Sequence, residues 1–297
     1  MKTVRKTFFQ LLRSAFRRKH LFLVVNGFLI ASIFYFYSED RYEKRLFQAL
    51  ATHTKLKANS AIKDSLILQS LHLTHELGEQ RVNAFAPRAD FDLKSVFHPL
   101  TVDLMTVDGS CGSYSMILSR ILTELNISNR IVQMKVNGTY GGHIIVEAET
   151  AKNGWVVLDP SYDLSFRKPD GTLAAFSDIS KNWEHFSKQV PQGYNSDYRY
   201  EGARYTNWTK IPVLMPALKS ILTVVIGKER TETTSLRTLF LRKFHIMLLV
   251  MIFLELLLVG TVFFKYLRRN RQKTKSASTK PRFVIREPVT NAKPVVS

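Results

Sequence analysis

A single cysteine, Cys111, is the residue of this 297-residue chain that is best suited by type and setting to covalent chemistry. Small residues precede it, and the apolar residues after it recur at helical spacing, so we expect Cys111 at or just before a helix N-terminus. The partial positive charge there favours the thiolate, and the N–H groups of the first turn can stabilise an oxyanion. The alternative interpretation is a small buried hydrophobe, which is what most cysteines outside disulfides are.

A histidine and an aspartate follow at positions where strands are expected to begin and end. Apolar residues alternate over 131–136, which predicts a strand. A second strand is expected to begin at His143. A third is expected over 155–160, with Asp159 at its end. The turn between the first two contains Gly138, Gly141 and Gly142. Antiparallel pairing can bring His143 beside Asp159, and a histidine with such an acceptor presents its other ring nitrogen to a nucleophile. Taken separately, the two residues favour another interpretation: His143 as a surface residue at a strand end, and Asp159 as a turn former before Pro160.

The segment from about Gly109 to Tyr162 resembles the transglutaminase-like superfamily, whose fold is related to that of papain-like thiol proteases. The matching stretches are GSCGSYS at 109–115, ISNRIV at 127–132, His143 with the following VE at 146–147, and WVVLDP at 155–160. The resemblance implies a catalytic triad of Cys111, His143 and Asp159. One departure is Ile145, where many members have Trp in a His-x-Trp-x-Glu pattern, and this leaves the details of substrate binding open.

The chemistry that the resemblance implies is acyl transfer without a cofactor. Cys111 would attack an amide or ester carbonyl, His143 would carry the proton, and Asp159 would fix the imidazole tautomer. Water as the acceptor makes a protease or amidase, and an amine as the acceptor makes a new amide bond; bacterial and archaeal relatives favour hydrolysis slightly. The substrate would be a protein, a peptide or a cell-envelope amide. The alternative class is a non-catalytic domain of this fold that serves as a scaffold or partner-binding module in an envelope assembly.

The formal net charge of +19 resides almost entirely in two tails. Residues 1–20 hold seven Lys and Arg without an acid, and residues 265–297 hold ten against the single Glu287. The intervening chain is nearly neutral. Because an electrostatic footprint for nucleic acid belongs on the folded part, we expect no nucleic-acid partner.

The two basic tails border the two most apolar stretches. Residues 21–37 carry no charge, and residues 244–264 carry only Glu255, so both approach the ~20 residues that a helix needs to cross a bilayer. The alternative for the first segment is a cleaved signal peptide, and the alternative for the second is a buried core helix. The length of the two segments and the basic residues beside them favour two membrane helices. Basic flanks stay in the cytoplasm, which puts residues 38–243 on the other side of the membrane. Glu255 is costly in lipid and should have a partner.

These features predict an α+β protein in which a transglutaminase-like (papain-like) domain, a helix packed on an antiparallel sheet, is flanked by two transmembrane helices. Its segments are a basic cytoplasmic N-terminus (1–20), a transmembrane helix (21–37), an extracytoplasmic domain (38–210, core 109–166), an apolar interfacial connector (211–243), a second transmembrane helix (244–264) and a basic, disordered cytoplasmic tail (265–297). Helical spacing over 39–77 predicts one or two helices before the core. The apolar run 213–227 is broken by Pro216 and is too short to span.

Two other groups of residues have weaker support as sites. His72 and His75 lie three residues apart on an expected helix, but no nearby cysteine or carboxylate pair completes a metal set, so we expect partly exposed helix residues and no metal. Aromatic residues are frequent over 183–208, where they line either a substrate cleft or a core.

Overall fold

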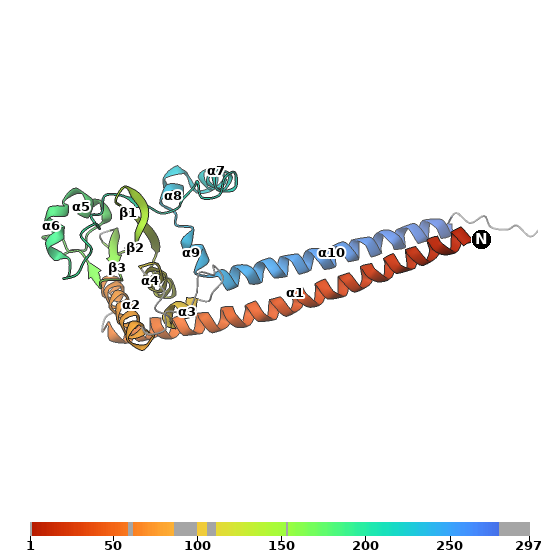
Figure 1. Cartoon of the computed structure of the whole chain (residues 1–297), viewed down its shortest axis with the longest axis horizontal. Coiled ribbons are helices and arrows are strands. Elements are labelled where there is room, and N and C mark those ends of the chain that lie inside the picture. The colour runs from red at the N-terminus through yellow and green to blue at the C-terminus, as the bar shows by residue number, and fades with distance from the viewer. Residues whose placement is uncertain (1, 59–61, 86–99, 106–110, 153, 279–297) are drawn as a thin grey trace, which may run out of the picture. The chain divides into compact units, whose positions relative to one another are not determined.

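The computed structural model describes residues 2–58, 62–85, 100–105, 111–152 and 154–278 (Figure 1). The chain divides into two compact units. The helical unit contains residues 1–33 and 249–297, and the sheet unit contains residues 34–248. Helix α1 (Lys2–Lys57) and helix α10 (Lys243–Ser278) each contribute to both units.

A five-stranded antiparallel sheet in the order β4-β3-β2-β1-β5 forms the centre of the sheet unit. Its strands are β1 (Asn129–Val136), β2 (Thr139–Glu149), β3 (Trp155–Asp159), β4 (Leu164–Ser165) and β5 (Ala203–Arg204). The three predicted strands and the α+β class are confirmed. Strands β4 and β5 have only two residues each, which is too short for an alternating pattern to indicate them.

The first hairpin is tighter than the sequence predicted. Strand β2 begins at Thr139, so Gly141 and Gly142 lie inside the strand instead of in the turn. The turn consists of Asn137 and Gly138, whose φ angles of +48° and +79° suit a two-residue hairpin. An irregularity in the pairing between Met134 and Lys135 absorbs the change in register.

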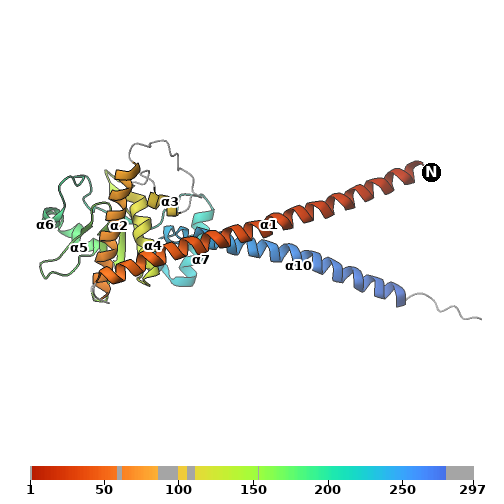
Figure 2. The ribbon, with the colours of Figure 1, turned by 90° about the horizontal axis from the view of Figure 1, so that it is seen from below.

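Helices cover both faces of the sheet (Figures 1 and 2). The helices of the sheet unit are α2 (Lys63–Phe85), α3 (Leu100–Met105), α4 (Cys111–Glu124), α5 (Phe176–Lys181), α6 (Trp183–Phe186), α7 (Leu214–Ile226), α8 (Lys228–Thr233) and α9 (Arg237–Phe240), with a short 3₁₀ helix at Ser187–Gln189. The helices predicted over 39–77 are therefore the end of α1 and most of α2. Helices α2 and α4 pack on one face, and α5 packs on the other.

Alternation along the strands divides the core between these two faces. Ile131, Val146 and Leu158 belong to the cluster on the α4 face, together with Phe47 and Ala51 from the end of α1. The cluster on the α5 face is rich in aromatic side chains. Its central members are Val132, Ile145, Val157, Phe166 and Tyr200.

A buried ion pair network joins α4 to α1. Arg120 of α4 is 2% exposed, and its guanidinium Nη2 lies 3.0 Å from Glu124 and its Nε 4.0 Å from Glu43 of α1. The Phe47 ring lies 5.7 Å from the same guanidinium. Because removing one partner of a buried pair leaves an uncompensated charge, this network fixes the register between the two helices.

The apolar segments 21–37 and 244–264 are both helical, as predicted. Helices α1 and α10 contain segments long and apolar enough to cross a membrane, at His20–Lys57 and Lys243–Arg271. Within the helical unit, the side-chain amide of Asn26 donates a 2.5 Å hydrogen bond to Glu255. The expected partner of Glu255 is thus the polar residue that interrupts the other apolar segment.

Two predictions about the flanks are wrong. The basic segment from Lys265 was expected to be disordered, but α10 continues through Ser278; residues 279–297 lie outside the described part. Lys, Arg and Gln are good helix formers, and extending an existing helix costs little.

Pro216 does not break the apolar run at 213–227, because it lies in the first turn of α7, where the missing N–H would have no partner within the helix. Helix α7 has no buried residue, and Val224 is 87% exposed.

Gly78 of α2 lies against the ring of Tyr114 in the first turn of α4. A Cβ added at Gly78 would lie 1.9 Å from Tyr114 Cε1, so the two helices can approach only without it. We expect Gly78→Ala to destabilise the sheet unit by ~1–3 kcal/mol through overpacking, measured by thermal unfolding followed by near-UV circular dichroism. Gly27→Ala is the matched control, because Gly27 is also helical and a Cβ added there would have nothing within 4 Å. Unchanged stability of Gly78→Ala would contradict this packing.

Candidate active site

Cys111 is the first residue of α4, as the sequence predicted. The helix forms here because Ile117, Leu118, Ile121 and Leu122 recur at helical spacing and are at most 1% exposed against the sheet. The residues just before it, 106–110, lie outside the described part. Cys111 itself is partly exposed.

His143 and Asp159 lie on neighbouring strands and face the same side of the sheet. The register sets Val146 opposite Leu158, so Asp159 is opposite Ile145 and diagonal to His143. His143 Nε2 and Asp159 Oδ2 are 2.6 Å apart. The backbone N–H of Ser161 donates a 3.2 Å hydrogen bond to the other carboxylate oxygen. The predicted contact between the two side chains is therefore present in the structure.

The pair is almost completely removed from water. His143 is 1% exposed and Asp159 is fully buried. Burial lowers the pKa of His143, but its interactions with Asp159 and Cys111 outweigh burial and raise the pKa to about 9. The imidazole is thus held as a cation at neutral pH, between a carboxylate and a thiol.

Cys111 interacts with the imidazole of His143. The ring nitrogen Nε2 is bonded to Asp159. The other nitrogen, Nδ1, is buried and makes no hydrogen bond within the described residues. The thiol is nevertheless close enough to raise the pKa of His143. Catalytic hydrogen bonds are often loose in unliganded sites and tighten when substrate binds. The structure therefore brings all three predicted site residues together.

A hydrogen bond couples the cysteine helix to the histidine strand. Ser115 Oγ, one helical turn after Cys111, donates a 2.8 Å hydrogen bond to the carbonyl of Ile144, which follows His143. A slip of α4 along the sheet would break this bond and separate the sulfur from the ring. The sequence contained Ser115 within the motif at 109–115 but gave no sign of this partner.

Tyrosines cover the imidazole on the α5 face. The Tyr198 ring stacks on His143 with a centroid distance of 4.1 Å and an interplanar angle of 11°. Tyr162 meets the same ring edge-on at 6.1 Å. Burial raises the pKa of Tyr194, which packs on Tyr162 at 4.6 Å. The aromatic segment therefore contributes both to the core and to the wall of the site, and only its composition was visible in the sequence.

The two histidines of α2 support the loop that follows Asp159. His72 Nδ1 lies 2.8 Å from Asp163, and His75 Nδ1 lies 3.2 Å from the carbonyl oxygen of Pro160. The hydrogen bond to Asp163 raises the pKa of His72. His72 is exposed and His75 is half-buried, as predicted. No group of three or more potential metal ligands occurs in the described ranges.

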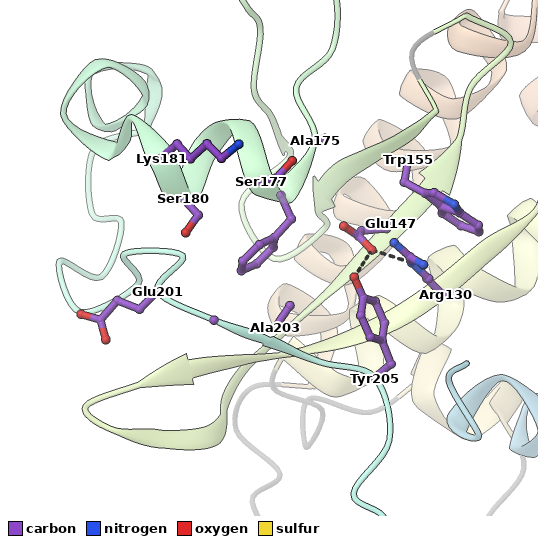
Figure 3. Close-up of a pocket in the computed structure, with 12 residues that line it drawn as sticks. Arg130, Glu147, Trp155, Ala175, Ser177, Ser180, Lys181, Glu201, Ala203 and Tyr205 are labelled. Atoms are coloured by element: carbon purple, nitrogen blue, oxygen red, sulfur yellow. Dashed lines mark hydrogen bonds and ion pairs between the residues drawn. The ribbon is translucent and has the colours of Figure 1, made fainter. Parts of the chain in front are cut away.

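A cavity of about 560 Å³ lies further along the same sheet face (Figure 3). The Arg130 guanidinium lies between the rings of Trp155 and Tyr205, at 4.1 and 4.3 Å, and its Nε is 2.6 Å from Glu147. Tyr205 donates a 2.9 Å hydrogen bond to the same carboxylate. Glu147 follows His143 by four residues of strand, or roughly 13 Å. The charges of Arg130 and Glu147 in this wall neutralise each other.

Comparison of the chain with protein-family models, with curated proteins and with solved structures gives no match.

Proposed function

We propose that this protein is a membrane-anchored, transglutaminase-like thiol enzyme that cleaves or transfers amide or acyl groups through Cys111, His143 and Asp159. The observation that carries the proposal is the buried imidazole, which is bonded to Asp159 through Nε2 and whose pKa is raised by both Asp159 and Cys111. A histidine oriented in this way by a carboxylate is the arrangement that activates a nucleophile.

The reaction needs only these groups and an acceptor. His143 is already the imidazolium at neutral pH, so Cys111 reacts as the thiolate, and its sulfur adds to the substrate carbonyl carbon. Collapse of the tetrahedral intermediate breaks the carbon–nitrogen bond, and the imidazolium gives its proton to the leaving amine. Water or a second amine then attacks the thioester and loses a proton to the neutral His143, and collapse of the second intermediate releases the Cys111 thiolate. The N–H groups in the first turn of α4 are suited to stabilise the oxyanion.

The arrangement of elements supports a papain-like assignment of the domain. The cysteine begins a helix that packs on an antiparallel sheet, and the histidine and aspartate come from adjacent strands. Ile145, at the position where many transglutaminase-like proteins have Trp, is fully buried in the core. Any substrate contact that this Trp makes in relatives must come from another residue here, and Tyr198 is the aromatic side chain beside His143.

A non-catalytic scaffold is the second candidate function, and one observation favours it. The His143 ring is 1% exposed and is stacked on Tyr198, and this burial restricts the approach of a substrate to the imidazole. A buried charged pair can also persist for structural reasons, because removing one partner destabilises the fold. The reactivity of Cys111 separates the two functions.

We expect iodoacetamide to alkylate Cys111 rapidly at neutral pH, and His143→Ala to slow alkylation by about tenfold or more, because loss of the imidazolium removes the cation that stabilises the thiolate. The rate is measured by mass spectrometry of the intact, detergent-solubilised protein. His53→Ala, which removes an exposed histidine of α1, is the matched control and should leave the rate unchanged. A rate equal to that of a model thiol, with no effect of His143→Ala in a folded protein, would support the scaffold.

Two membrane crossings, with both ends in the cytoplasm, fit the distribution of charge. The basic residues flank the outer ends of the two apolar helices, and such flanks stay in the cytoplasm. The sheet unit then faces the periplasm or the cell exterior, where protein, peptide and cell-envelope amides are the available substrates. The exposed apolar surface of α7 suits the interfacial connector, since this helix is too short to span.

A topology reporter tests this orientation. We expect a reporter fused after Ser297 to be active in the cytoplasm, and one inserted at the exposed turn near Asp170 to be active only on the other side. A reporter inserted at Lys152, a second exposed turn of the sheet unit, is the control and should match the Asp170 insertion. A cytoplasmic signal from both insertions would contradict the orientation.

A further inference from the structure

Two arginines beside the candidate active site, Arg204 and Arg237, form no ion pair with any acid that the structure describes. The Arg204 guanidinium donates to Gln133 Oε1 from Nε and Nη2, at 3.1 and 2.8 Å, and lies 4.8 Å from the centre of the Tyr140 ring. It also reaches the carbonyl oxygen of Tyr140 at 3.5 Å. These neighbours orient the guanidinium without neutralising its charge. Among the described residues, no carboxylate is paired with Arg204.

Strand β5 directs Arg204 away from the cavity of Figure 3. Ala203 and Tyr205 line that cavity, on the sheet face that also carries His143. Because neighbouring side chains of a strand point to opposite faces, Arg204 lies on the α4 face.

The pairing of three strands then aligns Arg204 with the start of α4. Arg204 is opposite Gln133, and Gln133 is opposite Ile144, which gives a row of roughly 10 Å across the sheet. Ile144 packs against the α4-face cluster, and a Cβ added at Gly112 would be only 3.5 Å from its Cδ1. Gly112 is the residue after Cys111, so this row ends beside the nucleophile.

Arg237 reaches the same region from the segment that precedes α10. Thr206 Oγ1 donates to the carbonyl of Thr234 at 2.7 Å and accepts from the N–H of Leu236 at 3.0 Å. These bonds hold Arg237 near the end of β5, and Leu241 enters the core on the α4 face. Arg237 is half-buried, and within the described part of the chain it makes no hydrogen bond or ion pair.

The electrostatics agree with this placement. Burial lowers the pKa of Arg237, the charge of Cys111 raises it, and Arg204 lowers it. The charge of Arg237 therefore interacts with both the Cys111 sulfur and the Arg204 guanidinium. The two half-buried cations repel each other and form no ion pair with an acid of the described ranges, and such an arrangement favours binding of an anion.

We infer that Arg204 and Arg237 form a cationic subsite that binds a carboxylate of the acyl substrate next to Cys111. The inference rests on the proposed function and adds a substrate class, namely an acyl donor that carries a carboxylate close to the bond that is cleaved. A guanidinium is suited to this task because its planar donors match a carboxylate in a bidentate geometry.

Two alkylating agents that differ by one charge test the subsite. Iodoacetate and iodoacetamide react with the same sulfur, but only iodoacetate carries a carboxylate. We expect Arg237→Gln to lower the rate ratio of iodoacetate to iodoacetamide by about fivefold to tenfold, because one nearby cation is lost from a poorly screened site. Arg204→Gln should act in the same direction, and Arg237→Lys should keep most of the ratio.

The controls separate this inference from other roles of the arginines. Lys152→Gln removes one cation from the far end of the strands and should leave the ratio unchanged. An equal fall of both rates in Arg237→Gln would assign Arg237 to thiolate stabilisation, and an unchanged ratio would exclude it from the site. Both outcomes overturn the subsite.

A competition experiment on the wild-type protein needs no variant. Acetate, but not acetamide, should slow the alkylation of Cys111 by iodoacetate. Failure of the proposed function is distinguishable, because it would show in the iodoacetamide rate alone.

Discussion

The hydrogen bond between His143 and Asp159 is the interaction on which the rest of this structure depends. Both groups are removed from water, and burying an unpaired charge costs far more than a single contact returns. The protein offsets that cost by placing the two residues on adjacent strands, diagonal to each other, with Tyr198 over the ring and Cys111 beyond it. The pairing register of the sheet therefore also sets the position of His143 relative to Asp159.

The same elements connect this pair to the two helices that contain the long apolar segments. Ser115 bonds α4 to the strand of His143, and Arg120 bonds α4 to Glu43 of α1, the helix that contains the first apolar segment. At the other end, Thr206 holds the segment that leads through Arg237 to α10. Displacement of either long helix would therefore also shift the start of α4, because the contacts that connect them are buried and close-packed.

Local pattern was sufficient to predict the helix at Cys111, the three long strands and the contact of His143 with Asp159. Each depends on periodicity that can be read within a few residues. The sequence did not reveal contacts between distant segments: Asn26 with Glu255, His75 with Pro160, Tyr198 with His143, and the two-residue strands. These depend on tertiary packing, which no local pattern encodes. The extent of α10 was missed because a basic composition indicates solvation but does not prevent a helix from continuing.

Titration of the His143 imidazole by nuclear magnetic resonance tests the central claim most directly, with His143→Gln to assign the signal. The account predicts a midpoint near the value of about 9, against an ordinary 6.5. Asp159→Asn and Cys111→Ser should each lower it. Because the folded-state pKa is raised, the associated stability is complete below about 6.5 and is lost as the pH rises through about 9. An ordinary midpoint that neither substitution moves would contradict an imidazole held between Asp159 and Cys111.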